Sequence, residues 1–233
     1  MRKIWTAVVV SILLVGCTAL PSPENISASL EESEMKENYE RSQPDREGED
    51  TITETLPGDL LFDFQPGTPA WSSVDDSVMG GISQSASQIL EDGTLEFSGA
   101  MSLENNGGFA SIQSPWNPID LTGYDGLLLR VRGDGQIFRL RIRTDGTGPQ
   151  IAYNSLFETL DGEWTTLYIP FESMIPTYRG FRVPAGRLDP GAVTSLGLML
   201  SDKQPGEFSL QVDWIRAVSE EEISTRLAPT REA

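Results

Sequence analysis

Short runs of alternating hydrophobic and polar residues follow one another from about Gly58 to Ser219, and none of them sustains a helical period. They are bounded by Gly, Pro, Asn and Asp, the residues that commonly separate β-strands. The expected strands include residues 60–64, 94–97, 109–112, 163–171, 193–201 and 207–218. About eight to ten strands in about 160 residues predict an all-β fold, a sandwich or jelly roll.

The clearest alternation runs from Gly126 to Arg143, where LLLRVR and QIFRLRIR flank Gly133-Asp134-Gly135. This pattern predicts a tight hairpin. Because successive side chains in a strand point to opposite faces, the apolar residues are expected to face the core: Leu127, Leu129, Val131, Phe138, Leu140 and Ile142. The opposite face would then carry a shared patch of Arg130, Arg132, Arg139, Arg141 and Arg143.

Like charges on paired strands repel each other, so we expect negative charge to lie close to this arginine patch. One interpretation is a ligand or partner, because arginine forks suit carboxylates, phosphates and sugar hydroxyls. The alternative is a solvated sheet face that Asp and Glu of adjoining strands neutralise.

Three polar, glycine-containing segments are further candidates: residues 71–83, 104–111 and 201–206. Adjacent residues of an extended chain point to opposite faces, so Asp75 and Asp76 could not hold one cation or act together as acid and base without a bend. Structural turn chemistry is the favoured role for these two. The binding candidates in the segments are Trp71, Asp75, Asp76, Asn105, Asp202 and Lys203.

The composition removes several classes of function. The chain has no histidine, one cysteine and a formal charge of −18. Imidazole-dependent catalysis, Cys/His zinc sites and an intramolecular disulfide are therefore excluded. We expect no catalytic residue, cofactor or metal, and the acidic charge argues against nucleic acid as a partner.

The N-terminus resembles a bacterial lipoprotein signal. Arg2 and Lys3 precede the apolar residues 4–16, a stretch too short to span a bilayer as a helix. It ends in Leu14-Val15-Gly16-Cys17, which resembles a lipobox, so residues 1–16 are expected to be removed and Cys17 to carry lipid. The chain would then be exported and anchored to a bacterial membrane. A plain secretory signal cut after Ala19 is the alternative.

Residues 17–57 are expected to form a disordered acidic tether behind this anchor. Between Thr18 and Pro57 there are eleven Asp or Glu against three Lys or Arg, with Tyr39 as the one aromatic residue. Such a segment buries too little apolar surface to offset its ordering entropy. A local charged helix over residues 30–41 is the alternative. Residues 58–219 form the expected domain, and residues 220–233 a flexible tail.

Several blocks of the domain resemble the complex I intermediate-associated protein 30 family. They are WSSVDDSVMGGISQS, ENNGGFASIQS, DLTGYDGLLLRVRGDGQIFRLRIRTD, YRGFRVP and SLGLMLSDKQPGEFSLQVDWIRAV. The resemblance implies a galactose-binding-like β-sandwich, related in shape to carbohydrate-binding modules. It also implies a role in assembling the NADH dehydrogenase complex. Some relatives are fused to a nucleotide-binding domain, but no dinucleotide fingerprint follows a strand here.

These observations lead to a non-enzymatic, lipid-anchored binding or scaffold module that resembles an assembly factor for a membrane protein complex. The alternative is a glycan-binding lipoprotein that uses the same sandwich on polysaccharide. A carboxylate-dependent glycoside-active enzyme is a third interpretation, which no marked acid pair supports. Sugar binding would need exposed aromatic rings, and the candidates are Trp71, Trp116, Tyr153 and Tyr178.

Overall fold

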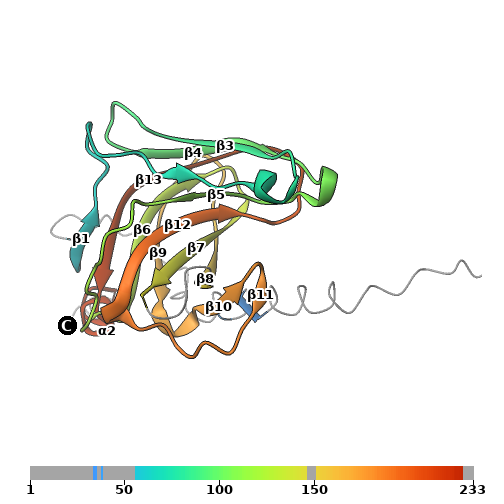
Figure 1. The fold of residues 1–233 in the computed structure, drawn as a ribbon. Helices are drawn as coiled ribbons and strands as arrows, with labels where there is room; N and C mark the ends of the chain where they lie inside the picture. Colours follow the sequence, from blue (N-terminus) through green and yellow to red (C-terminus); the bar gives the residue numbers. More distant parts are fainter. Residues whose placement is uncertain (1–33, 36–37, 39–55, 146–150, 228–233) are drawn as a thin grey trace, which may run out of the picture.

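Two antiparallel β-sheets pack face to face in the computed structural model, which describes residues 34, 35, 38, 56–145 and 151–227 (Figure 1). The chain is therefore an all-β sandwich, as the sequence predicts. The expected signal peptide and Cys17 lie outside the described residues. Within those residues, no helix has both the length and the apolar character needed to cross a membrane.

The first sheet has six strands in the order β3-β4-β13-β6-β9, with β1 paired to β13. Its strands are β1 (Asp59–Phe62), β3 (Gln84–Ile89), β4 (Leu95–Met101), β6 (Gly126–Gly133), β9 (Trp164–Pro170) and β13 (Gly206–Val218).

The second sheet has seven strands in the order β11-β10-β8-β7-β12-β5-β2. Its strands are β2 (Ser72–Ser73), β5 (Ala110–Gln113), β7 (Ile137–Thr144), β8 (Ile151–Glu158), β10 (Ile175–Tyr178), β11 (Phe181–Arg182) and β12 (Val193–Leu200). Four short 3₁₀ turns join strands in the described ranges: η1 (Asp76–Met79), η2 (Glu104–Asn106), η3 (Phe171–Ser173) and η4 (Pro190–Ala192).

The hydrophobic core lies between the two sheets. The six apolar residues expected to face inward from β6 and β7 are all buried there. Phe97 and Phe208 meet edge to face with ring centroids 4.9 Å apart, and Phe138 packs against both. The prediction of the core face is therefore confirmed.

The predicted hairpin between β6 and β7 is wrong. β6 pairs with β13 and β9, whereas β7 pairs with β8 and β12, so the connection crosses from one sheet to the other. Asp134 holds this crossing in place, because its carboxylate accepts bonds from the backbone N–H groups of Gln136 at 3.2 Å and of Ser209 at 2.8 Å. Both edges of β6 already have partners, which leaves no place for β7.

Strands β3, β8 and β10 lie where no strand was expected. In β8 both faces are buried: Tyr153 and Phe157 enter the core, while Asn154 and Leu156 lie on the opposite face under other groups. A strand buried on both faces shows no alternation of apolar and polar residues, so periodicity does not reveal it.

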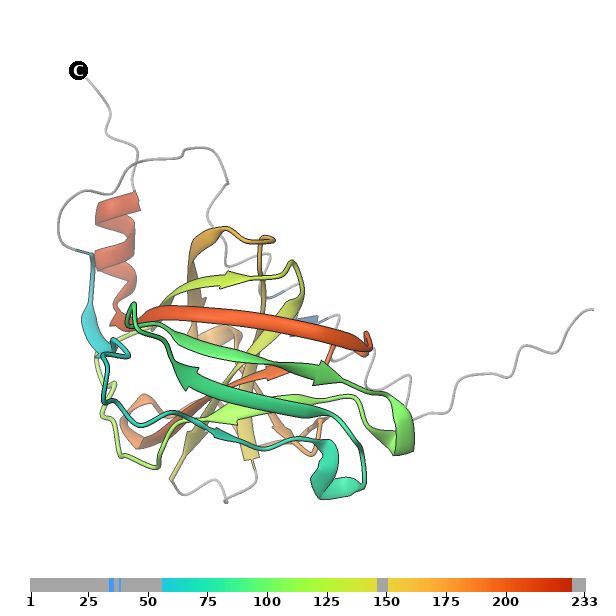
Figure 2. The same cartoon turned by 90° about the horizontal axis from the view of Figure 1, so that it is seen from above.

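The predicted flexible tail begins as a helix, α2 (Glu220–Leu227). Ser219 and Glu222 form a capping box: the Glu222 carboxylate accepts the Ser219 backbone N–H at 2.9 Å, and the Ser219 hydroxyl accepts the Glu222 N–H at 3.3 Å. Ile223 packs beside Leu128 and Trp214 on the six-stranded sheet. Figures 1 and 2 show α2 and β1 at one end of the sandwich and η1 and η2 at the other.

Five residues of the expected tether are described, Glu34, Met35, Asn38, Leu56 and Pro57, and the first three correct that prediction locally. Glu34, Met35 and Asn38 are helical, and Met35 is 2% exposed. In Figure 1 this piece, drawn in blue, lies beside β10 and β11. Apolar contacts with the second sheet order this part of the segment, and they favour the alternative of a local helix.

Candidate functional site

Asp75 and Asp76 both tie the start of β3 to the start of β5. Asp76 is fully buried and accepts bonds from the backbone N–H groups of Ser83 at 2.9 Å and Gly108 at 2.7 Å. The Asp75 carboxylate accepts the Ser85 N–H at 2.8 Å and the Ser111 N–H at 3.1 Å. Each carboxylate therefore bonds to both segments, which is the structural role that the sequence favours for these two residues.

The Asp76 carboxylate is held in its charged form. Burial acts to raise its pKa, but hydrogen bonds from Ser83, Gly108 and Phe109 outweigh this and leave the pKa below its usual value. Gly81 and Gly107 let the loops approach, since a Cβ on either would lie within 3 Å of the Asp76 side chain. Among the described residues no group of three acidic, His or Cys side chains could hold a metal.

The other loop candidates do not form one site. Trp71 is buried against Phe62 and Phe64, with centroid distances of 5.3 and 5.8 Å. Asn105 is exposed in η2, and Asp202 accepts the Gln204 N–H at 3.1 Å in the turn beside Lys203. The pairs Gly206–Met101 and Leu200–Ala110 bring these two loops to the same end of the sandwich.

The arginine patch is divided between the two sheets because the hairpin is absent. Arg130 and Arg132 lie on β6, where both guanidinium groups stack over the Trp164 ring, at 5.6 and 4.9 Å from its centroid. Arg130 forms an ion pair with Asp213 at 3.1 Å, and Arg132 donates to Gln211 at 2.9 Å. Neighbours on the same sheet therefore compensate these two charges, which matches the alternative of a neutralised sheet face.

Arg139, Arg141 and Arg143 lie on the outer face of the seven-stranded sheet, hereafter the outer face. Strand register sets three rows across this face. Arg139 lies between Met199 and Leu156, Arg141 between Gly197 and Asn154, and Arg143 beside Ser195. The next neighbours outward in these rows are Ser111, Gln113 and Ile175.

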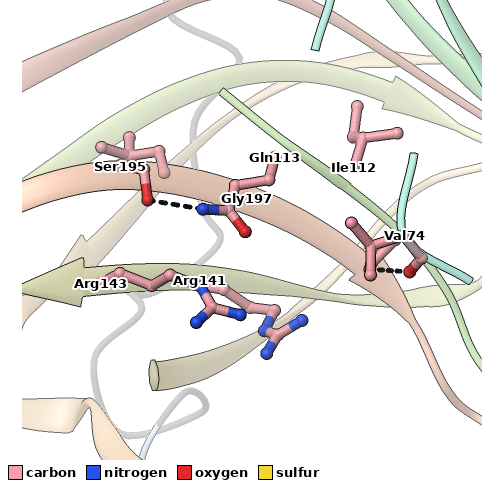
Figure 3. Close-up of a pocket in the computed structure, with 9 residues that line it drawn as sticks. Val74, Ile112, Gln113, Arg141, Arg143, Ser195 and Gly197 are labelled. Atoms are coloured by element: carbon pink, nitrogen blue, oxygen red, sulfur yellow. Dashed lines mark hydrogen bonds between the residues drawn. The ribbon is translucent and has the colours of Figure 1, made fainter. Parts of the chain in front are cut away.

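A small pocket, hereafter the Arg141 pocket, opens beside the middle row of the outer face. It has a volume of about 20 Å³, room for about one water-sized group. Figure 3 shows Arg141 and Arg143 side by side on β7, with Gln113 donating to the Ser195 hydroxyl, a bond of 2.9 Å. Val74, Ser111, Ile112, Leu196 and Gly197 complete the lining.

Arg141 is the least compensated of the three arginines. Its Nε is buried and has no hydrogen-bond partner among the described residues. Burial lowers its pKa to about 10, and the charges of Arg143 and Arg139 add to this effect. Burial also lowers the pKa of Arg143, whereas Arg139 donates to the Ser201 hydroxyl at 2.7 Å.

The same face has an apolar part next to Arg139, hereafter the Met35 site. The Met35 side chain packs there against Leu156 and Ile175, with Ile137 beside them. Arg139 Nη1 lies 3.5 Å from the Met35 sulfur, and Glu34 forms an ion pair with Arg182 of β11. A short helical piece of polypeptide thus occupies this end of the outer face.

The four aromatic candidates for sugar binding divide equally. Trp71 and Tyr153 are buried, and the Tyr153 hydroxyl donates to backbone carbonyls of residues 185 and 187. Trp116 is 70% exposed and Tyr178 is 38% exposed. Thr177 lies two residues after Ile175 on β10 and therefore shares the outer face with it. Tyr178 is the next residue, so its side chain points to the opposite face of the sheet.

Sequence reasoning missed the neighbours that give the outer face its character. Gln113, Ser195 and Gly197 belong to expected strands, but nothing in the pattern pairs those strands with β7. Leu156 and Ile175 belong to β8 and β10, which were not expected at all. Ile137, which shares the face of the β7 arginines, and Leu156, which lies opposite Arg139, are the apolar residues that could have indicated a covered face.

A protein-family model decides the relationship of this chain to known proteins. The model of complex I intermediate-associated protein 30 matches residues 61–212, which include most of both sheets. The chain belongs to this family. The mouse mitochondrial complex I intermediate-associated protein 30 is 35% identical over 101 residues, which are 41% of this chain and 31% of the mouse protein.

A probable complex I intermediate-associated protein 30 of Caenorhabditis elegans is 27% identical over 139 residues, 56% of this chain and 39% of the worm protein. This chain thus matches about a third of the length of these relatives of the family. What the whole relatives do therefore does not transfer to it directly.

Solved structures show the same sandwich in carbohydrate-binding modules. The family 11 module of Clostridium thermocellum, in complex with a β-1,3-1,4-mixed-linked tetrasaccharide, superimposes with a TM-score of 0.55 at 20% identity. The match covers 71% of this chain and 98% of the module. A family 11 module of the cellulosomal cellulase Lic26A-Cel5E gives a TM-score of 0.56 at 19% identity, over 71% of this chain and 96% of that module. These similarities establish the fold.

Proposed function

We propose that this member of the complex I intermediate-associated protein 30 family is a non-catalytic, lipid-anchored module that holds a partner polypeptide on its outer face. The partner would belong to a membrane protein complex or one of its assembly intermediates. The lipid anchor would keep the sandwich close to that complex on the outer side of a bacterial membrane.

The Met35 site is the observation that carries this proposal. A helical piece of chain lies on the outer face, with Met35 buried between Leu156 and Ile175 and Glu34 paired with Arg182. Helices that dock through an apolar side chain, with charged residues at the rim, are a common mode of peptide recognition. A partner segment with a similar apolar side chain could take the same place.

The names of the relatives support the same class of function. The mouse and worm proteins are named for association with an intermediate of complex I, which is a protein partner. The adjacent carboxylates of Asp75 and Asp76 already serve the fold, because they bind backbone N–H groups at the start of β3 and β5. A role without catalysis is consistent with both observations.

Glycan binding is the second candidate. The sandwich is shared with family 11 carbohydrate-binding modules, and Trp116 is exposed. Trp116 lies at the end of β5, between Ser114 and Asn117, whose backbone N–H groups donate to carbonyls of Leu196 and Thr194. An aromatic ring at this edge could stack on a sugar.

Affinity isolation of the full chain from detergent-solubilised membranes tests the proposal. Leu156→Gln places a polar group in the Met35 site, and Val78→Gln, at a residue 69% exposed in η1, is the matched control. We expect the partner protein to be lost with Leu156→Gln and retained with Val78→Gln. Two results together would favour the second candidate. The wild type and Leu156→Gln would capture the same amount of partner protein, and the wild-type chain would be retarded in a gel that contains mixed-linked β-glucan.

A further inference from the structure

Arg141 is a half-buried cation with a buried Nε, and the described part of the chain supplies no anion for it. Its strand neighbours Gly197 and Asn154 are uncharged, and the flanking charges on β7 are the arginines 139 and 143. The lining of the Arg141 pocket contains no Asp or Glu. Burying an uncompensated charge is costly, so an arginine in this state is expected where a ligand supplies the opposite charge.

The polar groups beside Arg141 also suit an anion. The Ser195 hydroxyl already accepts a bond from Gln113 Nε2 at 2.9 Å, which leaves its own proton to be donated. Arg143 brings a second guanidinium to the same lining. Together these groups present N–H and O–H donors toward one small space.

The size of the Arg141 pocket limits what can enter it. Gly197 keeps the space open beside Arg141, since a Cβ at this residue would lie 3.7 Å from Arg141 Cβ and only 2.8 Å from the Ile112 carbonyl oxygen. A volume of about 20 Å³ accommodates about one or two oxygen atoms. A planar carboxylate fits such a space and matches the two parallel N–H bonds of a guanidinium.

We propose that the Arg141 pocket binds the carboxylate of an Asp or Glu side chain on the partner polypeptide, with Arg141 and Ser195 as its donors. This inference rests on the proposed function and adds a chemical requirement to it. Arg139 lies next to Met35, and Arg141 is two residues further along β7, about 6.6 Å away. The partner would therefore present an apolar and an acidic side chain about one helical turn apart, a separation of similar size.

Two short peptides test this requirement: acetyl-Met-Ala-Ala-Glu-amide and the same peptide with Gln in place of Glu. Each is titrated into the full chain in detergent and into its Met35→Ala variant, which leaves the Met35 site open. Binding is followed by the ¹H–¹⁵N signal of Arg141 Nε, assigned by its absence in Arg141→Gln, and by calorimetry. Arg132→Gln, on the other sheet, is the matched control.

We expect the Glu peptide to shift the Arg141 Nε–H signal and to bind about tenfold or more tightly than the Gln peptide. Arg141→Gln should abolish this difference, and Arg132→Gln should keep it. Met35→Ala should bind the Glu peptide more tightly than the wild type, because the Met35 side chain no longer competes.

Equal affinity for the two peptides would overturn the carboxylate pocket and leave the proposed function standing. Binding of glucuronate, with neither peptide bound, would overturn both and favour a uronic acid glycan. Tighter binding of inorganic phosphate than of the Glu peptide would overturn the assignment to a carboxylate.

Discussion

Arginines of one sequence pattern have different roles because their strand partners differ. Arg130 and Arg132 rest on Trp164 and meet Asp213 and Gln211, so their charges are compensated within the sheet. Arg141 comes from the same alternation but lies beside uncharged neighbours and other arginines. Each arginine offers the same charge and hydrogen-bond donors. The strand pairing decides whether neighbouring side chains already bind them.

Replacing Arg141 with Met should stabilise the isolated chain. The variant keeps an unbranched side chain of similar length and removes a half-buried charge, so we expect the free energy of unfolding to rise by up to about 1 kcal/mol. Urea unfolding at pH 7 measures the change. Arg216→Met is the control. Arg216 donates to the carbonyl oxygens of Pro57 at 3.0 Å and Gly58 at 2.6 Å, so its replacement should lower the free energy of unfolding. A comparable loss of stability in both variants would show that Arg141 is needed by the fold.

Asp76→Asn should destabilise the chain by about 3 kcal/mol at pH 7, because an amide nitrogen would face the donors of Ser83, Gly108 and Phe109. The folded-state pKa of Asp76 is lowered, so its contribution is present above about pH 4 and is lost as the pH falls through the folded value. The stability difference between wild type and variant should therefore be constant from pH 5 to 8 and shrink below pH 4.

Thermal and urea unfolding across this pH range provide the measurement for Asp76→Asn. The exposed Asp63, whose backbone oxygen accepts a bond from the Gln65 side chain at 3.5 Å, is a suitable control site as Asp63→Asn. A difference between wild type and Asp76→Asn that persists unchanged at pH 3 would contradict the role of the charged carboxylate.

At the scale of elements, alternation identifies faces but not pairing. The inward faces of β6 and β7 could be predicted because each strand has one apolar and one charged side. Their assignment to one hairpin failed because the turn sequence Gly133-Asp134-Gly135 serves a crossing between sheets equally well. β8 escaped notice because its second face is buried as well, with Met35 packed on Leu156, which removes the polar half of the pattern.

The candidate site was predictable in part for the same reason. The arginines of β7 could be named from the sequence, whereas Ser195, Gln113 and Leu156 depend on which strands flank β7. The start of α2 carries a Ser-x-x-Glu pattern at Ser219 and Glu222, a signal that the expectation of a flexible tail did not use. Local signals of this kind needed no knowledge of pairing.

The Met35 site makes a testable contribution to stability. Met35→Ala removes most of a side chain that is 2% exposed, and we expect a loss of about 1 kcal/mol once the gain in chain entropy is counted. For a domain of this size the unfolding midpoint should fall by about 2–4 °C. Met35→Leu, which keeps a similar volume, should stay within about 1 °C of the wild type. Identical midpoints for Met35→Ala and wild type would show that the segment does not hold the sheet in solution.

At the scale of the whole molecule, the contact at Met35 would set how far the sandwich stands from a lipid anchor. Glu34 is seventeen positions after Cys17, and an extended chain of this length spans at most about 60 Å. From Cys17 to Leu56 the limit is about 140 Å. A partner that displaces Met35 would therefore also lengthen the reach of the domain, which couples binding on the outer face to distance from the membrane.

This coupling requires that Cys17 carry lipid, and Cys17→Ser tests it. A serine has no thiol for the acyl glycerol, so we expect the variant to lose labelling by a radioactive fatty acid and to accumulate as precursor or leave the membrane fraction. Two or more acyl chains hold a protein far more firmly than one, because each buried methylene contributes about 0.8 kcal/mol. The wild type should therefore stay with the membrane in high salt. Unchanged labelling of Cys17→Ser would contradict the lipid anchor at Cys17. It would also contradict the coupling between Met35 and the distance of the domain from the bilayer.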